Sequence, residues 1–142
     1  MINHVMVVDH DEISMFITKH KIIKTGFAKN IISMSKSTKA LDYFEYVSSN
    51  PEGIIPELIF LDLSMPVMNG WEFVKLFTKH FLPLFPSTKI CITSFLNPSE
   101  EVKAIVHPCV INFINKPLSL HVLEGLKDHE LLRRYFMEVS VK

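Results

Sequence analysis

The chain has no excess of charge of either sign, which argues against one broad class of function. Fifteen basic residues balance fifteen acidic ones among 142 residues, so the formal net charge is zero. A domain that binds nucleic acid usually gathers a basic excess on one face. The basic pair Arg133-Arg134 has Glu130 and Glu138 close by, and we interpret this stretch as a solvated helix face. We therefore expect no nucleic-acid partner.

Paired cysteines and long apolar runs are also missing. Cys91 and Cys109 are far apart and form no CxxC motif, so we expect them to be buried and reduced. No stretch approaches the ~18 apolar residues of a membrane helix. The first residues lack the basic region of a signal peptide. These absences predict a soluble, cytoplasmic protein with no membrane partner.

The chain does contain a regular alternation of short apolar runs and helical patterns. Five apolar runs have the length of strands: residues 5–8, 31–34, 58–61, 89–93 and 110–114. Helical patterns follow them: residues 13–25 before Gly26, a helix that Ser37 can cap, Trp71–Phe77, a start at Asn97–Glu100, and Leu118 to about Val139. The runs are short, and the first and third have almost no polar alternation, which is typical of a parallel sheet covered on both faces. The pattern predicts one doubly wound α/β domain.

Aromatic residues on the predicted helical faces are candidates for its core. We assign four phenylalanines to the core or its edge: Phe16, Phe44, Phe73 and Phe77. We expect Trp71 to pack the third helix onto the sheet. These assignments leave the polar residues at the strand ends as the candidates for function.

Four of the five predicted strands end at, or just before, a side chain suited to phosphoryl chemistry: Asp9, Asp62, Thr93 and Lys116. In a doubly wound fold, such groups collect at the carboxyl ends of the strands. Clustered carboxylates suit a hard divalent cation such as Mg²⁺. A lysine and a hydroxyl can hold phosphoryl oxygens, and an aspartate can accept the phosphoryl group. The set predicts a site for phosphoryl transfer, with Ser94 either part of it or a cap for the next turn.

The segment Leu61–Gly70, LDLSMPVMNG, resembles the phosphoacceptor segment of response-regulator receiver domains, the CheY-like family. Thr93 and the pair Lys116-Pro117 continue the family pattern, and the resemblance spans the chain from Val5 to the last helix. It implies a (βα)5 flavodoxin-like fold with a five-stranded parallel sheet of order 2-1-3-4-5. It also implies that residues 1–142 are a single receiver domain without an output domain.

The resemblance assigns roles to the strand-end residues. Asp62 would accept the phosphoryl group, and Mg²⁺ would be held by Asp9, Asp62 and the backbone carbonyl of Ser64. Thr93 would hydrogen-bond a phosphoryl oxygen. Lys116 would pair with the phosphoryl group, with a cis peptide bond to the next proline.

Two further assignments concern the loop and the switch. Phe113 matches the aromatic switch position on the fifth strand, without the hydroxyl of a tyrosine. Met65-Pro66 and Gly70 would shape the loop after the acceptor. The switch surface would span residues 97–139.

One position departs from the family pattern. Receivers usually have two adjacent acids after the first strand, but His10 follows Asp9 here. Imidazole is a poor ligand for Mg²⁺, so we predict weakened metal binding. Asp11 can compensate as a ligand or can interact with the first helix's N-terminus instead.

The resemblance also implies partners. A histidine kinase or histidine phosphotransfer protein would supply the phosphoryl group, and a downstream protein would read the switch. A homodimer through the fourth helix, fifth strand and fifth helix is a further option. The chain would be a self-phosphorylating acceptor and not a turnover enzyme.

Three alternatives compete with this interpretation. The first is a pseudo-receiver, an interaction module that takes no phosphate because of His10. A phosphatase with an aspartyl nucleophile would need a second acid where Ser64 stands. A flavodoxin-type cofactor binder would need a glycine- and hydroxyl-rich loop where the acids follow the first strand.

Overall fold

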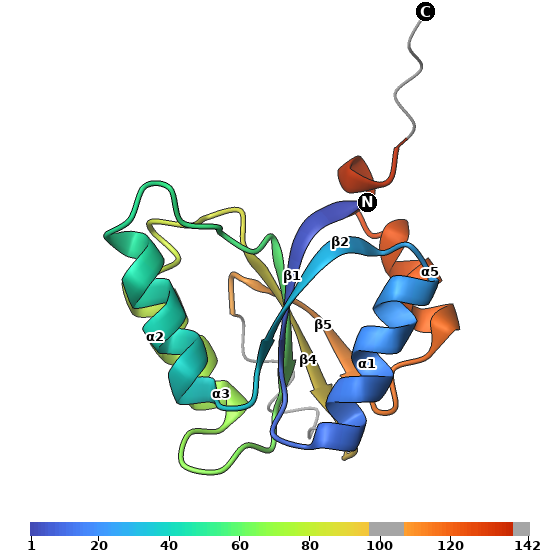
Figure 1. Cartoon of the computed structure of the whole chain (residues 1–142), viewed down its shortest axis with the longest axis horizontal. Coiled ribbons are helices and arrows are strands. Elements are labelled where there is room, and N and C mark those ends of the chain that lie inside the picture. Colours follow the sequence, from blue (N-terminus) through green and yellow to red (C-terminus); the bar gives the residue numbers. More distant parts are fainter. Residues whose placement is uncertain (97–106, 138–142) are drawn as a thin grey trace, which may run out of the picture.

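A computed structural model describes residues 1–96 and 107–137, and its centre is a parallel sheet (Figure 1). Its strands are β1 (Ile2–Val8), β2 (Ala28–Met34), β3 (Leu58–Asp62), β4 (Lys89–Ser94) and β5 (Val110–Asn115). Their order is β2-β1-β3-β4-β5, and every neighbouring pair is parallel. The predicted sheet order and flavodoxin-like fold are confirmed.

Helices cover both faces of this sheet. They are α1 (Glu12–Lys24), α2 (Ser37–Ser48), α3 (Gly70–His80) and α5 (Leu120–Lys127), followed by the 3-10 helix η1 (Arg133–Tyr135). In Figure 1, α2 and α3 lie to the left of the sheet, and α1 and α5 lie to the right. The helix start predicted at Asn97–Glu100 lies outside the described residues. None of the helices described is both long and apolar enough to cross a bilayer.

Each face of the sheet has its own apolar core. On the α2–α3 face, Phe44, Phe73 and Phe77 are fully buried, as predicted, and the rings of Phe44 and Phe77 lie 5.0 Å apart. Trp71 packs beside Phe113 on this face, with ring centroids 5.9 Å apart. On the α1–α5 face, the core includes Ile22 and Phe27. Both cysteines are free and buried, as predicted, with Cys91 in this core and Cys109 in the core of the α2–α3 face.

The prediction that Phe16 belongs to the core is wrong. Its side chain is 71% exposed, and Ile13 and Ile23 on the same helix are also exposed. The residues of α1 that face the sheet are Ser14, Thr18 and Ile22. The reason is a hydrogen bond: the Ser14 hydroxyl donates to the buried carboxylate of Asp9, which turns the polar stripe inward. Ile13, Phe16 and Ile23 therefore point to solvent, whereas Ile22 on the inward stripe is buried.

Two helix ends also differ from the sequence-based expectation. The last helix was predicted to reach Val139, but α5 ends at Lys127, where Asp128 donates its N–H to the carbonyl of Gly125. Ser37 is not a cap: it is the first residue of α2, and its hydroxyl donates to the carbonyl of Met68. Its hydroxyl instead links α2 to the loop before α3.

A pair of glycine substitutions tests the backbone at the end of α1. Gly26 has φ of +63°, and neither Gly26 nor Gly125 has an atom within 4 Å of an added Cβ. Gly26→Ala is expected to lower the free energy of unfolding by about 1 kcal/mol, because a side chain disfavours the left-handed region. Gly125→Ala in α5 should raise it by about 0.5–1 kcal/mol. Urea unfolding of both variants measures the two changes in the free energy of unfolding. Equal changes of the same sign would contradict the assignment of Gly26 to the left-handed region.

Candidate functional site

The strand register brings the predicted functional residues to one edge of the sheet. Val8 of β1 pairs with Leu61 of β3, so Asp9 and Asp62 follow at the same level. Asp62 in turn pairs with Thr93 of β4, and Lys116 donates its backbone N–H to the carbonyl of the neighbouring strand at Ser94. The site is thus formed by the carboxyl ends of β1, β3, β4 and β5.

Lys116 lies between the two buried carboxylates. Its Nζ is 2.6 Å from Oδ2 of Asp9 and 3.4 Å from Oδ2 of Asp62, and the side chain is only 4% exposed. The ring of Phe95 covers the ammonium group, with its centroid 5.1 Å from Nζ. The Lys116–Pro117 peptide bond is cis, as the resemblance implied. One positive charge therefore serves two acids.

Asp9 is held as an ionised anchor. Its Oδ2 accepts hydrogen bonds from the Ser14 hydroxyl and from Lys116, both at 2.6 Å, and its Oδ1 accepts the N–H of Asp11 at 2.9 Å. Burial acts to raise its pKa, but the hydrogen bonds from Lys116, Ser14 and Asp11 outweigh burial and hold the pKa below the usual value. Sequence reasoning missed Ser14, whose only signal was a hydroxyl within a predicted helix.

Asp62 has the opposite electrostatic balance. Burial raises its pKa; the Lys116 charge opposes this, the Asp9 charge adds to it, and the net shift is upward. Its Oδ1 accepts the N–H of Ser64 at 3.2 Å. It lies in a cleft of about 280 Å³ whose lining residues are His10, Asp11, Asp62, Ser64, Ser94, Phe95, Leu96 and Lys116. Asp62 is therefore a carboxylate that lines the cleft, and its Oδ2 accepts no backbone hydrogen bond from the residues that the structure describes.

The loop after Asp62 returns close to the strand at Gly70. A Cβ at Gly70 would lie 2.9 Å from the Cα of Leu63 and 3.0 Å from the carbonyl oxygen of Asp62. The N–H of Gly70 donates to the carbonyl of Leu63, which fixes the start of α3 beside the acid. Only glycine permits this approach, in agreement with its predicted loop-shaping position.

The last two residues of β4, Thr93 and Ser94, carry hydroxyl groups that lie in different surroundings. Thr93 is buried beside Asp62 in the register of the sheet. Ser94 lines the cleft, and its Oγ accepts the N–H of Leu96 at 3.1 Å. Ser94 therefore caps the next turn and also lines the site. Phe113, the predicted switch residue, lies on β5 against Trp71.

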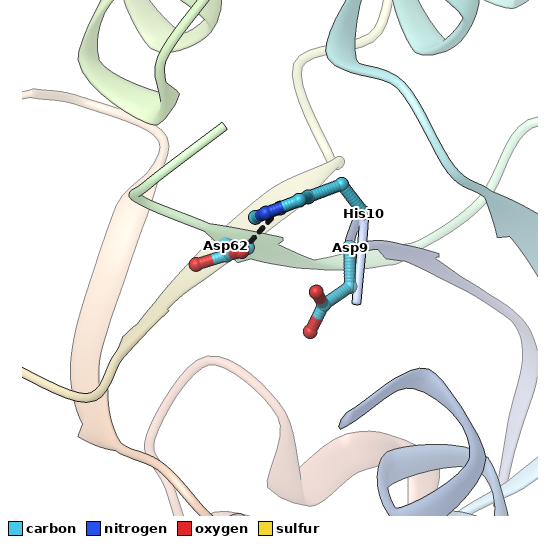
Figure 2. A group of neighbouring side chains, drawn as sticks. All are labelled: Asp9, His10 and Asp62. Atoms are coloured by element: carbon cyan, nitrogen blue, oxygen red, sulfur yellow. Dashed lines mark ion pairs between the residues drawn. The ribbon is translucent and has the colours of Figure 1, made fainter. Parts of the chain in front are cut away.

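Asp11 takes the second of its two predicted options. Its Oδ1 accepts the N–H groups of Ile13 and Ser14, so it caps the N-terminus of α1. Asp9, His10 and Asp62 each place one ligand atom within 4.8 Å of the others. Figure 2 shows the His10 ring turned toward Asp62, with Nδ1 3.4 Å from Oδ2.

Magnesium fits these residues poorly. Mg²⁺ prefers octahedral oxygen ligands and keeps several waters. Here the residue next to Asp9 offers an imidazole nitrogen, and both carboxylate oxygens of Asp9 already accept hydrogen bonds. Asp62 remains as an oxygen donor at the cleft, which Ser64 also lines.

Comparison with known proteins finds a matching family model and similar proteins. Residues 5–126 match the family model of the response regulator receiver domain. A two-component response regulator from Cytophaga hutchinsonii is 29% identical, with a TM-score of 0.80 over 93% of this chain and 98% of that chain.

Two curated relatives are much longer proteins. Hybrid signal transduction histidine kinase C of Dictyostelium discoideum is 30% identical over 125 residues, 84% of this chain and 9% of that protein. A cyclic di-GMP phosphodiesterase of Thermotoga maritima is 27% identical over 133 residues, 93% of this chain and 32% of that protein. The chain thus spans less than a third of the length of each.

The raised pKa of Asp62 predicts a stabilising substitution. A carboxyl with a raised folded-state pKa stabilises the fold at low pH, and that stability is lost as the pH rises from 3.8 toward the folded value. Asp62→Asn should therefore raise the free energy of unfolding at pH 7 and leave it unchanged well below pH 3.8. Urea unfolding in metal-free buffer measures this difference.

Asp42→Asn is the matched control, because Asp42 is exposed on α2 and should give no pH-dependent gain. A loss of stability in Asp62→Asn at pH 7 would show that Lys116 attraction dominates instead.

Proposed function

This chain belongs to the response regulator receiver domain family, and from that premise we propose that it accepts a phosphoryl group on Asp62. Receivers are phosphoacceptor modules of two-component signalling, and such a module implies a histidine kinase as partner. The observation that carries the proposal is the Lys116 ammonium 3.4 Å from the Asp62 carboxylate, at a cleft open to a donor.

The transfer step follows from this geometry. A carboxylate oxygen of Asp62 attacks the phosphorus of a phosphohistidine, and the phosphorus–nitrogen bond breaks. The donor imidazole leaves with the bonding electron pair and takes a proton from water. Lys116 offsets the negative charge on the phosphoryl oxygens, which is the main requirement of phosphoryl transfer. Asp9 keeps Lys116 in position through the 2.6 Å contact.

We propose Thr93 as the hydroxyl that binds the new phosphoryl group. Thr93 lies beside Asp62 on the adjacent strand, and Phe113 lies on the strand after it. Movement of Thr93 toward the phosphoryl group would favour one of two packings of Phe113 against Trp71. Phosphorylation would act as a population shift that a downstream protein reads.

The exposed apolar side chains near the cleft suit a phosphodonor protein. Ile13 and Phe16 on α1 are more than two-thirds exposed, and Phe95 at the cleft is 65% exposed. Between α1 and Phe95 lies a groove of about 290 Å³, lined also by Pro117 and Leu118. A helix that presents a phosphohistidine can place its apolar face on these residues and its imidazole above Asp62.

The second candidate is a pseudo-receiver that binds partners without taking phosphate. The observation that favours it is His10 beside an Asp9 whose oxygens are already hydrogen-bonded. The retained Asp62, Thr93 and Lys116 favour the acceptor instead.

Intact mass after incubation with acetyl phosphate and a divalent cation tests the acceptor proposal. We expect one phosphoryl increment on the wild-type chain, because Asp62 and Lys116 are already in place. Asp62→Asn should show none, and Asp42→Asn on α2 should behave like the wild type. No increment with Mg²⁺, Mn²⁺ or Co²⁺ would support the pseudo-receiver.

Phe16→Ala tests the donor surface separately. We expect at least a roughly tenfold lower rate of transfer from a phosphorylated histidine phosphotransfer domain that phosphorylates the wild type, because a docking contact is lost. The rate with acetyl phosphate should not change, because this small donor needs no docking. Tyr46→Ala removes an exposed aromatic ring from α2 and should leave both rates unchanged. Equal transfer to Phe16→Ala and wild type would place the docking surface elsewhere.

A further inference from the structure

His10 is the residue that distinguishes this cleft chemically. It directly follows the buried Asp9, and its side chain is 45% exposed at the mouth of the site. The ring nevertheless turns inward, with Nδ1 3.4 Å from Oδ2 of Asp62 (Figure 2). Together with Asp9 and Asp62, His10 forms a set of one nitrogen and two oxygen donors whose ligand atoms lie within 4.8 Å of one another.

We propose that this site selects a divalent transition metal ion of the Zn²⁺ class over Mg²⁺, with His10 and Asp62 as its protein ligands. The inference rests on the proposed function only for the purpose of the ion, which would bind beside the phosphoacceptor. Metal selectivity itself is a property of the unphosphorylated chain.

His10 and Asp62 offer two different types of donor atom. Imidazole is a good ligand for Zn²⁺, Fe²⁺, Co²⁺ and Ni²⁺, whereas Mg²⁺ favours oxygen ligands alone. A carboxylate serves both classes of ion. A nitrogen donor facing Asp62 therefore adds affinity for transition metals and adds little for Mg²⁺.

The separation of the two donor atoms favours a tetrahedral ion. A tetrahedral ion about 2.0–2.1 Å from a nitrogen and an oxygen holds those atoms roughly 3.4 Å apart. An octahedral ion with bonds of the same length holds adjacent ligands about 2.9 Å apart. The observed separation of Nδ1 and Oδ2 is 3.4 Å, so the present rotamers suit the tetrahedral arrangement.

The charge of the site gives a hard cation such as Mg²⁺ little attraction. Lys116 already lies 2.6 Å from Asp9 and 3.4 Å from Asp62, so its ammonium offsets one of the two carboxylates. Imidazole brings no negative charge to replace what Lys116 neutralises. Attraction by charge alone is therefore weak, and an ion that gains from a nitrogen bond has the advantage. The cleft above these donors, about 280 Å³, leaves room for the ion and its waters.

Metal binding by the full chain, at one fixed pH and without phosphodonor, tests this selectivity. Co²⁺ is the probe, because its visible absorption reports nitrogen ligation and coordination number, and Mg²⁺ then competes for the site. We expect His10→Asp to weaken Co²⁺ binding and strengthen Mg²⁺ binding. The ratio of their dissociation constants should shift by at least about tenfold, the scale of ligand-shell changes at metal sites.

His80→Asp is the matched control, because His80 is exposed at the far end of α3 and undergoes the same exchange of side chains. It should leave the ratio unchanged, and Asp62→Asn should abolish the Co²⁺ absorption band. An unchanged ratio in His10→Asp, or an unchanged band in Asp62→Asn, would overturn the inference. Phosphorylation of the wild type with an unchanged ratio refutes the metal inference alone. A shifted ratio without phosphorylation refutes the proposed function alone.

Discussion

Two buried carboxylates share one lysine in this protein, and the chemistry of the cleft depends on how that charge is divided. Lys116 approaches Asp9 more closely than Asp62, by 2.6 Å against 3.4 Å. Asp9 also receives hydrogen bonds from Ser14 and Asp11, so its pKa falls while that of Asp62 rises. The two acids consequently differ: Asp9 holds the lysine at 2.6 Å, and Asp62, at the cleft, lies 3.4 Å from it.

This division of charge explains the arrangement of the first helix. The carboxylate of Asp9 needs a hydroxyl donor on the α1 side, and Ser14 supplies it from the buried stripe. Because Ser14 and Thr18 face inward, Ile13 and Phe16 face outward. A polar requirement at the strand end therefore produces an apolar surface beside the cleft, and the same helix contributes to both the cleft and the surface around it.

The features that depend on local pattern were predictable from the sequence. The apolar strands and the polar residues at their ends lie where expected. The strand order, which came from the family resemblance, is also as expected. The orientation of α1 was not predictable. Ile13 and Phe16 lie on one stripe of this helix, and Ser14 and Thr18 lie on another. Apolarity alone assigns the first stripe to the core, but the second stripe faces the sheet. The early end of α5 and the hydrogen bond from Ser37 to Met68 depend on tertiary contacts without a sequence signal. Likewise, no sequence pattern indicates that Lys116 lies closer to Asp9, at 2.6 Å, than to Asp62, at 3.4 Å.

His10 changes the balance of the site more than a single substitution suggests. A second acid after β1 would give three carboxylates against Lys116, a strong field for a hard dication and a strong barrier to a phosphoryl anion. With imidazole there, two carboxylates face one ammonium group and a nitrogen donor. The metal-free cleft then repels phosphoryl oxygens less, because like charges that share a pocket destabilise one another. It also attracts hard cations less. The substitution therefore exchanges charge-based attraction for ligand chemistry, while Asp62, the proposed acceptor, and its lysine stay in place.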